Sequence, residues 1–339
     1  MQIKSYIRFT AAILIYGCFA WYLYPDHIDY SAKFRLLLPV NSVVAAAGCY
    51  ILSRRWLSGF LESLLAGAIF GFGPYFLSLA NFHPAAGLPA ALMPWCFLPA
   101  AYAARFNLRR LSIPACLLPF LAIVVFFSLT AKLRLFVAPL NISFSGYDLL
   151  GYFAPLLAAY KGYNLSGFYH IPLVGLVFGL FMLVKARRFG ILLIIAAAVT
   201  LVFCERVNSY LQICPLLWLS IPMLCGSIII AAGLQGLASA GAADRKWILY
   251  VVIVMCAVAI AELLLATKLF QIFLSLGDRY AILLCKDAMF YILGAVAAGI
   301  IFFISSAGVR LHWVRLAILA AAAGLDIFLG ARFISGAIL

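Results

Sequence analysis

The sequence predicts an all-α fold, a polytopic integral membrane helical bundle with about eleven transmembrane helices that form a single transmembrane domain over residues 1–339. Hydrophobic residues make up 67% of the chain and charged residues 10%, whereas an ordinary soluble domain has roughly 45–50% and about 25%. The apolar residues fall in long unbroken runs, a pattern typical of membrane helices and not of a β-barrel. A soluble fold could not bury so much apolar surface, so the lipid bilayer is the expected solvent.

Eleven apolar segments are expected to span the membrane. The third contains Gly71-Phe-Gly-Pro74, which predicts a bend or a local unwinding of the helix. The pairs Gly67-xxx-Gly71 and Gly175-xxx-Gly179 predict places where helix backbones approach closely. The second and fourth segments are short for a hydrocarbon core about 30 Å thick. The segments lie at residues 5–24, 36–52, 60–80, 89–104, 111–130, 168–184, 189–204, 211–236, 247–270, 287–306 and 313–332.

The lysines and arginines predict an orientation with the N-terminus in the cytoplasm and the C-terminus outside. Every connection on the cytoplasmic side then has at least two basic residues, whereas the loop around residues 81–87 on the other side has none. The compact loops and the lack of a targeting signal favour a multi-pass protein of a bacterial inner membrane. Fourteen of the 24 basic residues fall on the predicted cytoplasmic side: Lys4, Arg8, Arg54, Arg55, Arg105, Arg109, Arg110, Lys185, Arg187, Arg188, Arg245, Lys246, Arg310 and Arg315.

One long connection, residues 131–167, is expected on the outer side. Within it, the stretch from Tyr147 to Tyr160 predicts an amphipathic or interfacial helix, because tyrosine combines an apolar ring with a polar tip that suits the lipid headgroups. The loop is either an anchoring belt or a lid over a site that opens outward. Its aromatic residues are Phe136, Phe144, Tyr147, Tyr152, Phe153, Tyr160 and Tyr163.

Two of the ten acidic residues, Glu262 and Asp326, lie deep in apolar segments. A charge at mid-membrane costs at least ~2.5–3.5 kcal/mol on insertion scales, so such residues usually face a bundle interior or a wet cavity. They are candidates for binding a proton, a cation or a polar group of a substrate. The simpler alternative is a neutral carboxyl that is hydrogen-bonded to a neighbouring helix. Asp287, by contrast, is expected at a helix N-terminus, where the helix dipole favours a carboxylate.

Three histidines, His27, His83 and His170, fall on the predicted outer side, together with Asp26 and Asp29. Histidine and carboxylate side chains suit zinc or a similar metal, which makes these histidines candidate metal ligands. The three histidines come from separate loops, so only the fold can bring them together. The simpler interpretation is that they are scattered interfacial side chains.

Known catalytic and nucleotide-binding motifs do not occur in the chain. It contains no HExxH, GxSG or Walker A motif and no dinucleotide fingerprint, and its nine cysteines form no CxxC pair. The net charge of +14 comes from short basic clusters between apolar segments, so nucleic acid is not an expected partner. The sequence leaves the cofactor open.

Three function classes remain. The first is a transporter or binder of a small or lipid-like molecule, with Glu262 and Asp326 as the binding residues. The second is a membrane-embedded transferase: Asp26 and Asp29 in the first outer loop, covered by a larger loop, form a layout that resembles that of glycosyltransferases using a lipid-phosphate sugar donor. The third is a non-catalytic subunit or scaffold, whose glycine-rich faces bind other membrane proteins.

Overall fold

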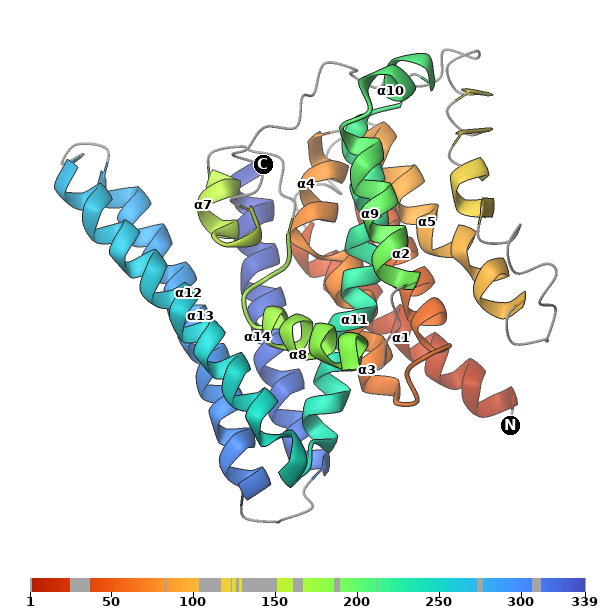
Figure 1. Cartoon of the computed structure of the whole chain (residues 1–339). Helices are drawn as coiled ribbons and strands as arrows, with labels where there is room; N and C mark the ends of the chain where they lie inside the picture. Colours follow the sequence, from red (N-terminus) through yellow and green to blue (C-terminus); the bar gives the residue numbers. More distant parts are fainter. Residues whose placement is uncertain are drawn as a thin grey trace. The chain divides into compact units, whose positions relative to one another are not determined.

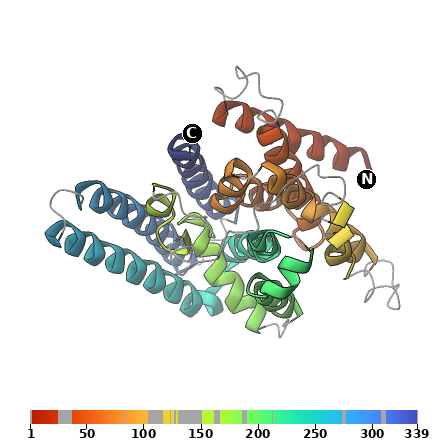
Figure 2. The same cartoon turned by 90° about the horizontal axis from the view of Figure 1, so that it is seen from above.

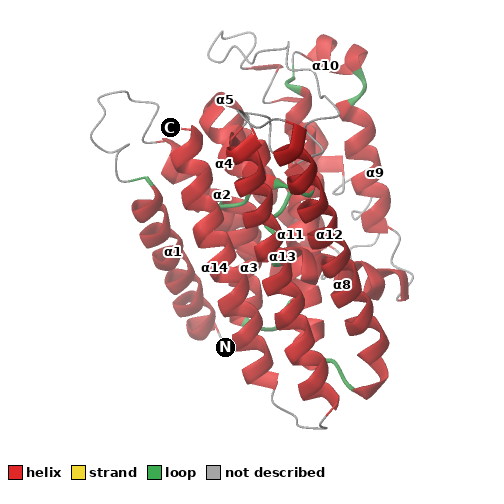
Figure 3. Ribbon diagram, turned by 90° about the vertical axis from the view of Figure 1, so that its left-hand side faces the viewer, coloured by secondary structure: helices red, strands yellow, loops and turns green. Residues whose placement is uncertain are grey.

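Helices form all the regular structure in the part of the chain that this computed structural model describes, and no strand occurs there (Figure 3). The all-α part of the predicted fold class is therefore confirmed. The described residues are 2–24, 37–82, 84–103, 117–122, 124–125, 128–129, 151–160, 167–185, 190–211, 213–272, 277–306 and 312–338.

The chain divides into two compact units. The first comprises Met1–Phe72, Phe76–Ser145 and Gly190–Ile228, and the second comprises Gly73–Tyr75, Gly146–Phe189 and Ile229–Leu339. Two helices cross this division. The helix α4 (Pro74–Phe82) has its first two residues in the second unit and the rest in the first, and α11 (Ser220–Ser239) begins in the first unit and ends in the second. The single transmembrane domain that the sequence predicts stays a prediction.

The first unit is built around α2, which packs against α1, α3 and α5. Close packing depends on the predicted small residues of α3: a Cβ atom on Gly67 or Gly71 would collide with the backbone of α2 at Ala46 and Ser42. This confirms the close approach that Gly67-xxx-Gly71 predicts. The elements of this unit are α1 (Gln2–Leu23), α2 (Leu37–Ser53), α3 (Phe60–Gly71), α4 (Pro74–Phe82), α5 (Pro84–Ala103), α9 (Gly190–Val202), α10 (Glu205–Leu211) and the 3-10 helix η3 (Pro215–Leu219).

The second unit is dominated by a long helical hairpin, α12 and α13, whose two arms lie side by side in Figures 1 and 2. The shorter helices α7 and α8 and the C-terminal helix α14 pack against this hairpin. The elements of this unit are α7 (Pro155–Tyr160), α8 (Pro172–Lys185), the 3-10 helix η4 (Ala242–Asp244), α12 (Arg245–Ile272), α13 (Gly277–Ser306) and α14 (His312–Ile338).

Glycines also set the packing of α8 on α11. A Cβ atom on Gly175 or Gly179 would meet the carbonyl oxygens of Ile230 or Ile229, and one on Gly233 would meet the carbonyl oxygen of Gly175. The close approach predicted from Gly175-xxx-Gly179 is therefore confirmed, and Gly233 is the matching small residue on the other helix.

Two arginines link helices at one end of the second unit by donating hydrogen bonds to carbonyl groups at helix ends. The Arg315 Nη1 atom donates to the carbonyl oxygen of Ala240, just after α11, at 2.7 Å. The Arg245 Nη2 atom donates to the carbonyl oxygen of Ser305 at the end of α13, at 3.2 Å. Such contacts satisfy carbonyl groups that have no partner within their own helix.

Six of the described helical segments are long and apolar enough to cross a membrane, or seven if the bent pair α9 and α10 forms one span. Two shorter apolar helices cover Leu38–Ser53 and Pro172–Lys185. The helix of the third predicted span is interrupted where Gly71-Phe-Gly-Pro74 indicates, because α3 ends at Gly71 and α4 begins at Pro74. Residues 60–79 still form one of the six segments. The count of eleven and the orientation with the N-terminus inside stay predictions.

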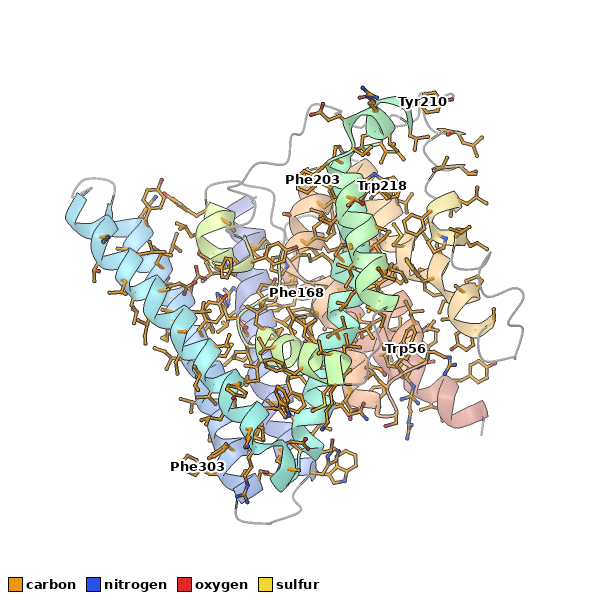
Figure 4. All side chains as sticks on the ribbon, in the orientation of Figure 1. Trp56, Phe168, Phe203, Tyr210, Trp218 and Phe303 are labelled. Carbon is orange, nitrogen blue, oxygen red and sulfur yellow. The ribbon has the colours of Figure 1, made fainter. Side chains whose placement is uncertain are left out.

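Large apolar side chains are exposed on the outer faces of these helices, as expected for contact with lipid. Phe303 on α13, labelled in Figure 4, is 72% exposed, and Leu264 on α12 is exposed as well. A protein in water would rarely leave so many such side chains uncovered. This distribution agrees with a membrane location.

Candidate functional site: a buried carboxylate and histidine cluster

The helical hairpin presents two carboxyl groups toward the protein interior. The buried residues of α12 recur every three or four positions, and Glu262 belongs to this stripe. On α13, Asp287 and Tyr291 are one turn apart and both buried. Helical periodicity thus places Glu262 and Asp287 on the protein-facing side of their helices. The buried stripe of α12 comprises Ile248, Val251, Met255, Ala259, Glu262 and Ala266.

His170 lies in a short irregular segment, residues 167–171, directly before α8. The side chains from Phe168, labelled in Figure 4, to Ile171 are all buried. The irregular backbone follows from Pro172, which fits the first turn of a helix but disfavours helical geometry at the preceding residue. The predicted span 168–184 is therefore too long at its N-terminal end.

The imidazole of His170 lies between two buried carboxyl groups from different helices. Its Nε2 atom is 2.7 Å from Oδ1 of Asp287 on α13, and its Nδ1 atom is 3.1 Å from Oδ1 of Asp326 on α14. All three side chains are fully buried. A neutral imidazole has one N–H group, whereas an imidazolium donates from both nitrogens. Two carboxylate acceptors therefore favour the imidazolium, which offsets part of their negative charge.

Aromatic rings fix the plane of this imidazole. The Phe290 ring is stacked on it with a centroid distance of 5.2 Å and an interplanar angle of 15°. The Tyr291 ring meets it edge-on at 4.9 Å and 83°. With its plane set by two rings and its nitrogens by two carboxyl groups, His170 has a single well-defined orientation.

Backbone N–H groups complete the bonding of the two aspartates. The Ile171 backbone nitrogen donates to Oδ2 of Asp326 at 2.6 Å, at the start of α8. The Leu156 backbone nitrogen, in α7, donates to Oδ1 of Asp287 at 3.4 Å. A helix N-terminus has free N–H groups and a partial positive charge, both of which favour a carboxylate. Asp326 therefore stabilises the start of α8 in the apolar interior.

Glu262 differs from the two aspartates in its bonding. Its side chain is 3% exposed, and neither carboxyl oxygen has a hydrogen-bond partner among the described residues. The Oδ2 atom of Asp287 is likewise buried and unpaired there. Glu262 is close enough to Asp287 and His170 to interact with their charges. The cluster thus contains three buried acceptor oxygens that receive no hydrogen bond from the part of the chain that the structure describes.

The helix α7 covers this end of the hairpin. The Tyr291 hydroxyl donates to the carbonyl oxygen of Phe153 at 2.7 Å, directly before α7. Ala154 packs with Ala266 of α12 and Leu284 of α13 in one apolar contact group. This helix lies within residues 131–167, and four of its six residues are buried.

The structure brings together three of the residues that the sequence singles out, Glu262, Asp326 and His170. The sequence assigns them to two different sites, the first two to ion or substrate binding and His170 to a metal. Both ring nitrogens of His170 face carboxyl groups, and the described residues contain no group of three or more His, Cys, Asp or Glu side chains suited to a metal ion. The remaining candidates, Asp26, Asp29, His27 and His83, lie outside the described residues.

The sequence interpretation of Asp287 is wrong. The helix α13 begins at Gly277 and not at Asp287, so Asp287 lies inside the helix and its carboxyl group binds His170 rather than capping an N-terminus. Arg279 and Lys286 make this stretch look too polar for a membrane helix, but both side chains are exposed while Asp287 is buried. The spacing of Asp287 and Tyr291 by four residues on one helical face is the signal that could have identified them.

Comparison with protein-family models, with curated proteins and with solved structures finds no match, so no relative assigns a role to this cluster.

Replacing Tyr291 with phenylalanine is expected to lower stability by about 0.5–1.5 kcal/mol, because the partly buried hydrogen bond from the Tyr291 hydroxyl to the carbonyl oxygen of Phe153 is lost. The measurement is thermal unfolding of the purified protein in detergent, combined with limited proteolysis around α7. Tyr210→Phe is the matched control, since that ring is 88% exposed. Equal melting temperatures for the two variants would contradict a role for this hydrogen bond.

Proposed function

We propose that this chain is a multi-pass membrane transport protein for a small or lipid-like molecule, and that the cluster of His170, Glu262, Asp287 and Asp326 is its ion-coupling site. The observation that supports this most is Glu262, whose carboxyl group is buried and unpaired among the described residues of a helix long and apolar enough to span the membrane. Ionisable residues at such positions are costly and are usually retained for ion or substrate pathways.

The net charge of the cluster makes its stability depend on whether a cation is bound. Three ionised carboxyl groups and one imidazolium would leave a net charge of −2 (−3 + 1) on fully or nearly fully buried side chains. A net charge is strongly disfavoured in a medium of low dielectric constant unless it is compensated. Uptake of a positive charge therefore stabilises the arrangement seen here, and its release destabilises it. A site whose occupancy changes the preferred conformation is what ion-coupled transport requires.

The short helix α8 is the element that such a change would move. Its 14 residues extend about 21 Å at 1.5 Å per residue, less than the ~30 Å hydrocarbon core. It begins in the apolar interior directly after the irregular segment that includes His170, and Asp326 binds the backbone N–H group of Ile171, the residue just before it. Helices that begin inside the membrane and point their N-termini at charged groups are common at transporter binding sites. The charge state of the cluster thus acts directly on the position of α8.

Glu262→Gln is expected to abolish accumulation driven by an ion gradient, because glutamine is nearly the same size but cannot change its charge. A thermal-stability screen of the purified protein against small metabolites and lipids supplies the ligand. Its uptake into proteoliposomes is then measured with an inward proton or sodium gradient. A gradient of one pH unit supports about tenfold accumulation per coupled proton, and the variant should show none.

Glu205→Gln is the control for this experiment, since Glu205 is exposed on α10 in the other unit. Gradient-driven uptake by Glu262→Gln equal to that of the unmodified protein would contradict the coupling role. A ligand that binds but is never accumulated would contradict transport, and would favour a binding role or the transferase alternative with Asp26 and Asp29. Co-purification of a stoichiometric membrane partner would favour the subunit alternative.

A further inference from the structure

We infer that Glu262 and Asp287 together form a proton-binding site, in which a neutral Glu262 donates a hydrogen bond to the free carboxyl oxygen of Asp287. The inference deepens the proposed function, on which its transport role rests, by naming the coupling ion as a proton. It makes no use of the identity of the transported molecule.

The hydrogen-bonding capacity of the two carboxyl groups is the first argument. Oδ1 of Asp287 accepts from His170 and Leu156, while its Oδ2 and both oxygens of Glu262 have no donor among the described residues. An ionised carboxylate only accepts, so two ionised groups cannot satisfy each other. One proton converts an oxygen of Glu262 into a donor. Ala266 of α12 packs with Leu284 of α13, so Glu262, one turn before Ala266, faces the turn of α13 that contains Asp287. The free oxygen of Asp287 can therefore accept from it.

The size of the ligand is the second argument. The three unpaired oxygens have essentially no accessible surface, so the described structure leaves no room beside them for a water molecule or a hydrated cation. A metal ion would need several ligands around it, and the described residues offer no such group. A proton adds no volume and needs no further ligand.

The groups that surround Glu262 make it the member of the pair that holds the proton. His170 donates toward Asp287 and Asp326, and backbone N–H groups bind both aspartates. The donors to Asp287 favour its ionised form, whereas Glu262 has no donor among the described residues. Tyr291 is a further titratable group close to the pair, and its hydroxyl group donates to the carbonyl oxygen of Phe153.

Infrared spectroscopy tests this directly, because a protonated carboxyl group has a C=O stretching band that an ionised one lacks. The full chain is placed in lipid nanodiscs at neutral pH without any substrate. The sequence has three glutamates, Glu62, Glu205 and Glu262, so labelling glutamate with ¹³C identifies a glutamic acid band without any mutation. The expected band shifts on ¹³C-glutamate labelling, shifts little on ¹³C-aspartate labelling, and exchanges slowly in heavy water because the site is buried.

Variants assign the band to one residue. Glu262→Gln should remove it, Asp287→Asn should change its frequency by altering the acceptor, and Glu62→Gln should leave it in place. Glu62 is the matched control, since it is a buried glutamate in the first unit and is also 3% exposed. The isotope labelling keeps the test decisive if Glu262→Gln does not fold.

Three results would overturn the inference. The first is the absence of a protonated glutamic acid band at neutral pH, and the second is a band that Glu62→Gln removes instead. The third is a band that disappears when sodium chloride replaces a salt of a bulky organic cation, because this would identify sodium as the ligand. The same measurements distinguish failure of the proton site from failure of the proposed transport function. Absent transport with an intact Glu262 band would contradict transport alone, and gradient-driven transport without the band would contradict only the proton site.

Discussion

His170→Ala is expected to destabilise the second unit by about 3–5 kcal/mol, the cost typical of removing one partner from a buried ion pair. The substitution takes a donor from Asp287 at 2.7 Å and from Asp326 at 3.1 Å, both fully buried. It also removes a ring that contacts Phe290 and Tyr291. Apparent melting temperatures of the purified protein in detergent would measure the loss.

A coupled-variant experiment separates the electrostatic part of this effect from the loss of packing. In His170→Ala combined with Asp287→Asn and Asp326→Asn, the amide side chains have no charge and still accept from Leu156 and Ile171. This triple variant should therefore be more stable than His170→Ala alone, which is a clear departure from additivity. His312→Ala, which removes the histidine next to Trp313, is the control. A triple variant less stable than the single one would mean that the charges contribute little.

Gly233→Leu is expected to cost about 3 kcal/mol, the upper end of the range for overpacking, because its Cβ atom would collide with the carbonyl oxygen of Gly175. The collision is with backbone, so no side-chain rotation relieves it, and α8 and α11 must move apart. The measurement is again thermal unfolding in detergent.

Gly324→Leu on α14 is the matched control, since a Cβ atom there meets nothing within 4 Å. Both substitutions replace a helical glycine with the same side chain, so the effect on helix propensity cancels. The difference in melting temperature then reports the close packing of α8 on α11. Equal melting temperatures would show that the two helices separate without cost.

The parts of the fold that sequence predicts well are those with a local cause. The helix of the third span is interrupted at Gly71-Phe-Gly-Pro74 because glycine and proline weaken a helix wherever they occur. Glycines spaced by four residues identify the faces of α3 and α8 that pack closely. The start of α13 is not predicted, because hydrophobicity alone cannot distinguish a charged residue that faces out from one that is buried against a partner.

The candidate site is predicted only in part, for a similar reason. The depth of Glu262 and Asp326 follows from the apolar runs around them. Their association with His170 does not, because His170 is 117 residues from Asp287 and 156 from Asp326 along the chain. Only tertiary structure selects such partners. For this reason the sequence predicts an interfacial position for His170, whereas the structure places it at the centre of a buried cluster.

The short α8 and its distant carboxylate partner have a consequence for how the protein is made. A ribosome produces His170 and α8 long before Asp287 and Asp326, so during synthesis the segment directly before α8 has neither its acceptor nor its counter-charge. A helix of 14 residues is also too short to settle across the bilayer by itself. Stable packing of α8 therefore requires α14 to have been made. A chain without α14 therefore lacks the acceptor of the Ile171 N–H group and one of the two carboxyl groups that bind His170.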